Sequence, residues 1–196
     1  MDAAELRARL AVASAPQVIR DDLAELATQP LTPAAVLVPF VLGPRPFVLL
    51  TKRTPHLTAH AGQVSFPGGR IDVTDPSPEA AALREAAEEI GLDSAEVELL
   101  GRLPDYVTGT GYRITPVVGL LPTEIAGALR PSESEVAAVF GLPLTVLLDP
   151  AAPQRRRAEM RGRAREFWVW PHPEHYIWGA TAGILVNLAA RLRGGG

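Results

Sequence analysis

The sequence predicts an α/β fold in which a mixed β-sheet is sandwiched between α-helices. Three observations support this class. Strand-like and helix-like segments alternate along the chain, but without a regular strand–helix–strand repeat. The composition, with 47% hydrophobic and 21% charged residues, is typical of a globular protein and not of a disordered one. The length of 196 residues suits one domain with a sizeable core.

Residues 1–30 are predicted to form a helical extension at the edge of a single domain that spans residues 31–193. Leu6 and Leu10 follow helical spacing, and Leu23 and Leu26 favour a second short helix. The first residues include acidic side chains and lack a continuous apolar run, so we do not expect a signal peptide there.

The first part of the domain is predicted to contain a β-hairpin, a short strand and a helix. Two apolar runs, residues 34–42 and 47–53, flank a Gly-Pro-Arg-Pro turn and predict the hairpin. Residues 63–66 predict a short strand that ends in a Pro-Gly-Gly turn. The helix is predicted over residues 78–90, because Ser77 suits the N-cap, Pro78 suits the first helical position and Gly91 suits the end.

The second part of the domain is predicted to add further strands and a closing helix. The strands are expected at residues 97–103, 113–121, 166–170 and 175–178, and the amphipathic helix at residues 179–193. Residues 104–112 are predicted to be a loop, and residues 135–149 form an apolar segment. Residues 155–165, with six arginines among eleven residues, are predicted to be a solvated loop between two strands. An anion-binding or self-association role is the alternative for that stretch.

Three carboxylates lie within one turn of the predicted helix 78–90. Glu85, Glu88 and Glu89 fall at i, i+3 and i+4, which places their Cβ atoms about 5–6 Å apart. Two unit charges about 6 Å apart repel by roughly 3 kcal/mol at an effective dielectric of about 20. A solvated acidic helix face is one explanation. The other is a cation, and oxygen-only carboxylate sites suit Mg²⁺ or Mn²⁺.

This helix and the glycine turn before it resemble the Nudix box, the strand–loop–helix signature of diphosphate hydrolases. The residues that match the second half of the box are Arg84, Glu85, Ala86, Glu88, Glu89, Gly91 and Leu92. The first half departs, since Asp75 stands at the place of the first Glu and the gap to Arg84 is one residue longer. The resemblance implies a Nudix fold, Mg²⁺ or Mn²⁺ on the three glutamates, and Arg84 as the residue that fixes a carboxylate.

The segment before the box resembles the extra motif of coenzyme A pyrophosphatases within the Nudix family. The matching residues are Leu49, Leu50, Thr51, Arg53, Gly62, Phe66, Pro67, Gly68 and Gly69. Two positions, Thr54 and Thr58, differ from the motif. The motif has an arginine at the position of Thr58, and Arg53 or Arg70 would replace that arginine as a phosphate partner. The resemblance implies substrate contacts from Arg53, Gly62, Phe66, Gly68, Gly69 and Arg70. Without it, a hairpin whose Gly and Pro residues only make turns would explain the segment.

Further candidates lie outside the two motifs. Glu135, or alternatively Glu133, is a candidate general base on a distal loop. Tyr112 is a candidate for stacking on an adenine or for anchoring its loop. His56 and His60 are spaced i, i+4, but no third ligand is near in sequence, so we do not expect zinc.

The function implied by the resemblance is metal-dependent hydrolysis of coenzyme A to 3′,5′-ADP and 4′-phosphopantetheine. The alternatives are a pyrophosphatase for ADP-ribose or another nucleoside diphosphate derivative, and a Nudix-like binding regulator without turnover. The full glutamate set argues against the regulator. A net charge of −3 and the lack of a long apolar run lead us to expect neither a nucleic-acid nor a membrane partner. The absence of cysteine fits a reducing cytoplasm, which is the expected location.

Overall fold

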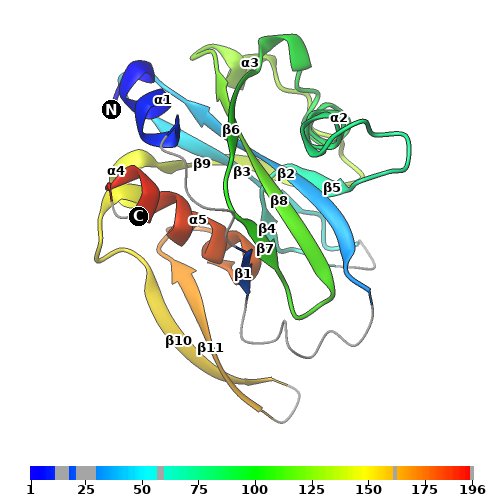
Figure 1. Ribbon diagram of the computed structural model, residues 1–196, viewed down its shortest axis with the longest axis vertical. Coiled ribbons are helices and arrows are strands. Elements are labelled where there is room, and N and C mark those ends of the chain that lie inside the picture. Colours follow the sequence, from blue (N-terminus) through cyan, green and yellow to red (C-terminus); the bar gives the residue numbers. More distant parts are fainter. Residues whose placement is uncertain (12–17, 21–29, 57–59, 161–162, 195–196) are drawn as a thin grey trace.

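The computed structural model describes residues 1–11, 18–20, 30–56, 60–160 and 163–194 (Figure 1). Its helices are α1 (Ala3–Ala11), α2 (Pro78–Ile90), the 3₁₀ turn η2 (Ser94–Glu96), α3 (Ile125–Ala128), α4 (Leu144–Leu148) and α5 (Gly179–Leu192). Within these ranges, no helix combines the length and the apolar character that crossing a membrane requires.

In the part of the chain that the structure describes, nine strands form one mixed sheet. They are β1 (Val18–Arg20), β2 (Thr32–Val41), β3 (Phe47–Arg53), β4 (Val64–Ser65), β5 (Gly68–Arg70), β6 (Glu98–Arg102), β7 (Asp105–Val107), β8 (Tyr112–Leu121) and β9 (Val136–Pro143). The long strands β2 and β8 run parallel over their full length, from the pair Thr32–Tyr112 to the pair Val41–Leu121. The predicted hairpin is confirmed, since β2 and β3 are antiparallel neighbours.

Helices cover both faces of this sheet, as Figure 1 shows for α2 on one side and for α1, α4 and α5 on the other. Strand β2 shows how alternation divides the core between the two faces. Ala35 and Leu37 pack in the cluster that contains the buried face of α2, whereas Val38 and Phe40 pack in the cluster that contains α5. The predicted α/β fold with a sandwiched mixed sheet is therefore confirmed.

Helix α2 begins and ends where its sequence predicts. The Ser77 hydroxyl oxygen accepts a hydrogen bond of 3.2 Å from the backbone N–H of Ala80, and Pro78 follows at the first helical position. Gly91 ends the helix in the left-handed region, with φ 65° and ψ 28°. A side chain at Gly91 would also meet Arg130, because its Cβ would lie 2.9 Å from the Cβ of Arg130. These caps fix the register of the carboxylates on α2.

The N-terminal segment supplies both a helix and a strand. Helix α1 buries Leu6 and Leu10 against the core that contains α5. Arg9 donates to the carbonyl oxygen of Leu192 at the end of α5, and Arg191 donates to that of Leu10 near the end of α1. Each helix thus supplies a cation to the last carbonyls of the other. Strand β1 pairs with β7, and the second predicted helix falls in residues 21–29, outside the described residues. The domain boundary at residue 30 stays a prediction.

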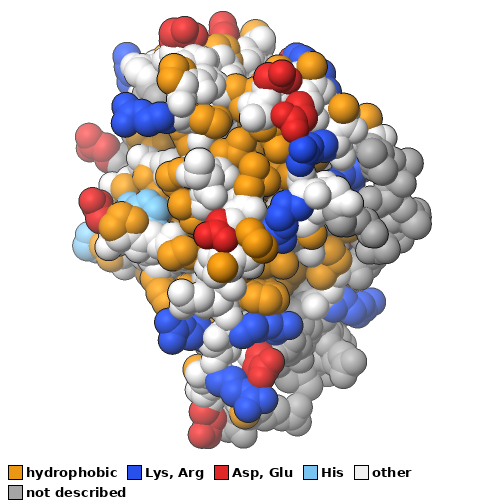
Figure 2. Space-filling view, turned by 90° about the vertical axis from the view of Figure 1, so that its left-hand side faces the viewer, with side chains coloured by type: hydrophobic (Ala, Val, Ile, Leu, Met, Phe, Trp, Pro, Cys, Tyr) orange, Lys and Arg blue, Asp and Glu red, His pale blue; other side chains and the backbone are white. Residues whose placement is uncertain are grey.

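The arginine-rich stretch is not the solvated loop that its composition predicts. It forms the antiparallel hairpin of β10 (Gln154–Met160) and β11 (Arg163–Trp170), and β12 (Ile177–Trp178) extends this second sheet. Cross-strand pairs explain the difference. Arg157 donates to Glu166 over 2.6 Å, and the Arg155 guanidinium lies 4.3 Å from the centre of the Trp168 ring. The hairpin projects from the body (Figure 1), and its charged side chains stand out at the lower end of Figure 2.

Strand β7 was not predicted either. Residues 105–107 lie in the stretch predicted to be a loop, yet they pair with Ile114 and Arg113 of β8 on one side and with β1 on the other. The Asp105 carboxylate accepts hydrogen bonds from Thr115 and Arg113, at 2.9 and 2.6 Å. The pairing with β1 joins residues more than eighty positions apart, so no local pattern indicates it.

Candidate active site

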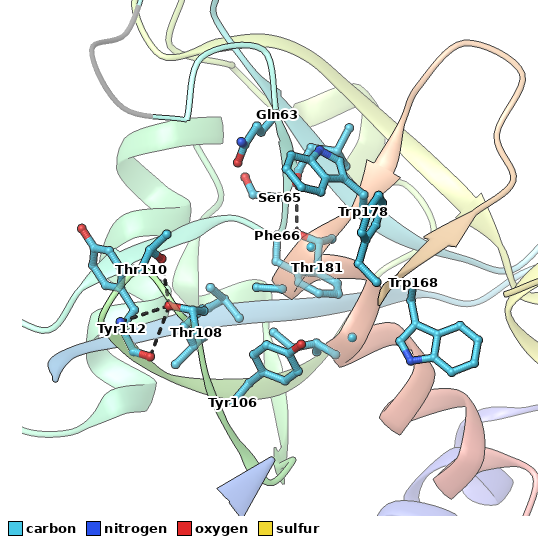
Figure 3. Close-up of a pocket in the computed structure, with 18 of the residues that line it drawn as sticks. Gln63, Ser65, Phe66, Tyr106, Thr108, Thr110, Tyr112, Trp168, Trp178 and Thr181 are labelled. Carbon is cyan, nitrogen blue, oxygen red and sulfur yellow. Dashed lines mark hydrogen bonds between the residues drawn. The ribbon is translucent and has the colours of Figure 1, made fainter. Parts of the chain in front are cut away.

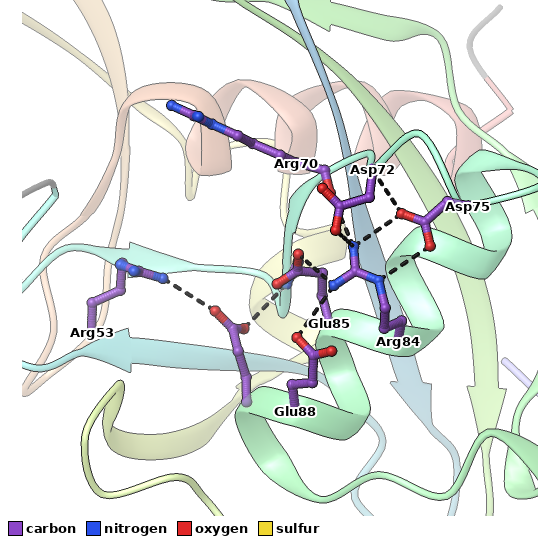
Figure 4. Close-up of polar contacts among 9 residues, drawn as sticks. Arg53, Arg70, Asp72, Asp75, Arg84, Glu85 and Glu88 are labelled. Atoms are coloured by element: carbon purple, nitrogen blue, oxygen red, sulfur yellow. Dashed lines mark hydrogen bonds and ion pairs between the residues drawn. The ribbon is translucent and has the colours of Figure 1, made fainter.

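Arg84 is the centre of a charged network on the exposed side of α2 (Figure 4). Its Nε and Nη2 atoms donate to the two oxygens of Asp75, at 3.1 and 3.0 Å. Its Nη1 atom donates to Glu85 over 3.0 Å and to Glu88 over 3.2 Å. The Arg84 guanidinium therefore holds two box glutamates in place. Its positive charge is compensated by the carboxylates that contact it.

Asp75 stands where the box pattern has its first glutamate, and the structure gives it a role. It makes the two parallel hydrogen bonds with Arg84 that fix a guanidinium most firmly. Its side chain is 7% exposed, and the hydrogen bond from Arg84 holds its pKa below the usual range. Asp75 thereby orients Arg84, a role that the sequence did not predict.

Glu89 is a buried carboxylate near the C-terminal end of α2, the helix of the strand–loop–helix motif. One oxygen accepts a hydrogen bond of 3.1 Å from Arg53 on β3, and the other accepts one of 3.1 Å from the backbone N–H of Gly68. Burial raises the pKa of Glu89 to about 7, although the Gly68 and Arg53 contacts oppose the shift. The nearby charges of Glu85 and Glu135 raise this pKa further.

Glu85 lies directly over the glycine turn. A Cβ atom at Gly69 would come within 2.5 Å of the Glu85 carboxyl carbon and 2.6 Å of both its oxygens. Burial raises the pKa of Glu85, Arg84 lowers it, and the charges of Glu88 and Glu135 raise it again. Residue 69 is therefore glycine because the Glu85 carboxylate occupies the space of a Cβ atom, and not because of its backbone angles.

Glu135 reaches the same region from the loop before β9. Backbone hydrogen bonds join this loop to the end of α2, from Ser132 N–H to the Glu89 carbonyl at 2.9 Å, and to β3, from Thr54 N–H to the Glu135 carbonyl at 2.9 Å. Glu135 is half-buried, whereas Glu133 is exposed. Of the two, Glu135 is the one whose charge acts on Glu85 and Glu89.

The donor set of this region suits a hard divalent ion. Carboxylates outnumber the guanidinium groups that contact them, since Asp75, Glu85 and Glu88 share Arg84, while Glu89 contacts Arg53. Among the side chains that the structure describes, no three acidic or histidine groups are placed as ligands of a single point. His60, one of the two histidines for which no zinc site was expected, contacts Gln63 at 2.9 Å.

A cavity of about 750 Å³ adjoins the glycine turn. The central sheet forms one wall, and α5 with the β10–β11 hairpin forms the other (Figure 3). Its lining includes the predicted substrate residues Arg53, Phe66, Gly68, Gly69, Arg70 and Tyr112. Gly62 is exposed, with φ 68°, and lies outside that lining, so the structure gives it the role of a turn residue.

Arg70 and Tyr112 form one edge of the cavity. The Arg70 guanidinium donates a 3.3 Å hydrogen bond to the Tyr112 hydroxyl and lies 6.0 Å from the centre of its ring. This contact raises the pKa of Arg70, which is exposed at the end of β5. The tyrosine therefore holds an arginine at the mouth of the cavity, which the sequence did not predict.

The second wall was also missed from the sequence. It contains Phe167, Trp168 and Trp178, together with the first turns of α5. Thr181 on α5 donates a 3.0 Å hydrogen bond to the carbonyl of Val64 on β4, and the Trp170 indole N–H donates one of 3.1 Å to the carbonyl of Ala182. These bonds attach α5 both to the central sheet and to the hairpin. The spacing of these aromatic residues in the sequence gives no sign of a cavity.

Comparisons with known proteins identify the family of this chain. The NUDIX domain family matches residues 31–161. Uncharacterized Nudix hydrolase NudL of Escherichia coli (strain K12) is 45% identical over 159 residues, which are 81% of this chain and 82% of NudL. Among solved structures, RenU, a Nudix hydrolase from M. smegmatis, aligns over 59% of this chain and 72% of its own, with 23% identity and a TM-score of 0.48. The NUDIX domain of Shewanella oneidensis NrtR, complexed with ADP ribose, aligns over 74% and 85%, with 23% identity and a TM-score of 0.45. The family match and the identity to NudL show that the chain belongs to the NUDIX domain family.

Proposed function

We propose that this Nudix hydrolase cleaves the diphosphate bond of coenzyme A or its derivatives, giving 3′,5′-ADP and 4′-phosphopantetheine. The observation that carries the proposal is the place of the glycine turn. Gly68 contacts Glu89, Gly69 lies against Glu85, and both glycines line the 750 Å³ cavity. The substrate assignment also draws on the resemblance of residues 49–69 to the motif of coenzyme A pyrophosphatases.

The box glutamates would hold Mg²⁺ or Mn²⁺ through Glu85, Glu88 and Glu89. When bound, a divalent ion supplies charge neutralisation at the diphosphate and lowers the pKa of water. Arg84 keeps Glu85 and Glu88 in position, and Arg53 with the Gly68 N–H does so for Glu89. Arg70, which lines the cavity, would bind a phosphate oxygen.

The size and lining of the cavity support a substrate larger than a simple nucleotide. Ligand sites commonly enclose about 300–1,000 Å³ and combine apolar walls with a few polar groups. This cavity has apolar walls from Val36, Phe66, Ile114 and Ile184, and arginines at its edges. Such a lining suits a molecule that has a charged diphosphate between a ring and a long uncharged arm.

A panel of diphosphate substrates tests the proposed function. We expect kcat/KM for coenzyme A to exceed that for ADP-ribose and for NADH, with 3′,5′-ADP and 4′-phosphopantetheine as the products. The reaction should require Mg²⁺ or Mn²⁺ and stop when the metal is chelated. Equal or faster hydrolysis of ADP-ribose would favour the alternative pyrophosphatase. Metal-dependent binding without any product would favour a regulator.

The general base is proposed to be Glu135. It is half-buried and its charge acts on two box glutamates, while Glu133 is exposed. A general base typically contributes about 10²–10⁴-fold to the rate. We therefore expect Glu135→Gln to lower kcat by roughly 10² or more, and Glu133→Gln to lower it much less.

The measurement is kcat against pH for both variants at saturating metal. Metal affinity, followed by titration of the activity with Mg²⁺, should change little in Glu135→Gln. Full activity in Glu135→Gln would place the base elsewhere, for instance among the helix glutamates.

A further inference from the structure

The far wall of the cavity has a row of side chains that the hydrolytic site does not use. In the register of the small sheet, Val169 lies opposite Trp178, so Trp178, Phe167 and Arg165 share one face. The rings of Phe167 and Trp178 meet edge to face, with centroids 5.6 Å apart at 65°. All three residues line the cavity.

The two ends of this row lie at different distances from the central sheet. Its Trp178 end lies near the central sheet, because β12 contacts β4 and Thr181 is bonded to Val64. Figure 3 shows Trp178 toward the segment of Gln63 and Ser65. Arg165 is two residues beyond Phe167 toward the tip of the hairpin, which is about 6–7 Å along a strand. A ring on the aromatic pair would thus have Arg165 on its side away from the central sheet.

One N–H group of the Arg165 guanidinium lacks a hydrogen-bond acceptor in the described part of the structure. Its Nε atom is buried and has no hydrogen-bond partner among the residues that the structure describes. The hairpin carboxylates do not supply one, since Glu166 and Glu159 lie on the opposite face of the ribbon and Glu166 contacts Arg157. A buried guanidinium N–H without an acceptor is costly, and phosphate is a strong acceptor for it.

We propose that Trp178, Phe167 and Arg165 form a subsite for the nucleoside end of the substrate. The base stacks on the aromatic pair, and Arg165 binds a phosphate monoester carried on the ribose, separate from the diphosphate that is cleaved. Stacking of a base on an aromatic side chain is typically worth about 1–3 kcal/mol and is tolerant of the base. The arginine then selects for the extra phosphate. This inference rests on the proposed function, because coenzyme A has such a phosphate and dephospho-coenzyme A lacks it.

Two matched variants of the hairpin test the subsite. Arg165→Gln removes the lining guanidinium, while Arg156→Gln removes an exposed one on the same face that contacts Gln154 and does not line the cavity. For each we measure kcat/KM for coenzyme A and dephospho-coenzyme A, and by calorimetry the Kd of 3′,5′-ADP and of AMP. Arg165→Lys keeps the charge and serves as the conservative variant.

The wild-type protein should prefer the ligand with the extra phosphate in both assays. Arg165→Gln should reduce that preference by about tenfold or more, Arg165→Lys should retain part of it, and Arg156→Gln should retain it fully. An unchanged preference in Arg165→Gln, or an equal loss in Arg156→Gln, overturns the subsite. If coenzyme A is not hydrolysed but Arg165→Gln still abolishes the preference for 3′,5′-ADP over AMP, the proposed function fails and the subsite stands.

Discussion

Replacing Glu89 with glutamine should lower kcat by about two to three orders of magnitude while the protein stays folded. Loss of one preorganised electrostatic group in an active site typically has an effect of about 10²–10³-fold. Glutamine keeps the shape of the side chain, and its single carbonyl oxygen can accept from one of the two donors, Arg53 or the Gly68 N–H, that contact the two carboxylate oxygens of Glu89. It lacks the charge that a divalent ion requires.

The same variant should change how the stability of the metal-free protein depends on pH. The folded state raises the pKa of Glu89 to about 7, so it binds the proton more tightly than the unfolded chain does. Its contribution to stability is therefore complete below the ordinary glutamate pKa of about 4.5 and is lost as the pH rises toward 7. We expect the melting temperature of the wild-type protein to fall over this range in the absence of metal, and that of Glu89→Gln to fall less.

Glu96→Gln is the matched control, because Glu96 is exposed in the 3₁₀ turn that follows α2 and is not a residue of the box. It should keep both the wild-type kcat and the wild-type pH dependence of melting. Full hydrolysis by Glu89→Gln at saturating Mg²⁺ would contradict the assignment of Glu89 to the metal site.

The parts of the fold that the sequence predicted are those with local causes. The bounds of α2 follow from a serine that caps it, a proline at its first position and a glycine in the left-handed region. The closeness of Glu85, Glu88 and Glu89 follows from helical spacing alone. Strand β2 was predicted because a long apolar run fits a strand that is buried on both faces.

The parts that were missed depend on pairing between strands and on contacts between segments far apart in the chain. The hairpin of β10 and β11 forms because Arg155 and Arg157 find Trp168 and Glu166 across the ribbon, and composition alone favoured a loop. The second wall of the cavity requires α5 to reach β4, a contact over more than one hundred residues. The sequence could suggest Glu135 as a base. Only the structure shows the backbone hydrogen bonds that attach its loop to β3 and to the end of α2, and so hold Glu135 near the box glutamates.

Replacing Gly69 with alanine should lower kcat by roughly 10²-fold with little change in stability. The backbone of Gly69 has no positive φ that would exclude alanine, whereas the new Cβ would lie 2.5 Å from the Glu85 carboxyl carbon. The end of a glutamate side chain can turn away at low cost, so the fold should persist while Glu85 leaves its position. A displacement of about 1 Å in an active site can reduce the rate about 10²-fold.

A variant at the neighbouring Gly68 serves as a control that distinguishes loss of activity from loss of stability. Gly68→Ala would bring a Cβ within 2.4 Å of the Ala35 carbonyl oxygen, at a φ of 153°, so it should lower the melting temperature. Gly127→Ala, where no atom lies within 4 Å of the new Cβ, should leave both activity and melting unchanged. In a Glu85→Ala background, Gly69→Ala should cause no further loss of kcat, because the carboxylate that it displaces is already absent. An additive loss in the double variant would show that Gly69 acts through something other than Glu85.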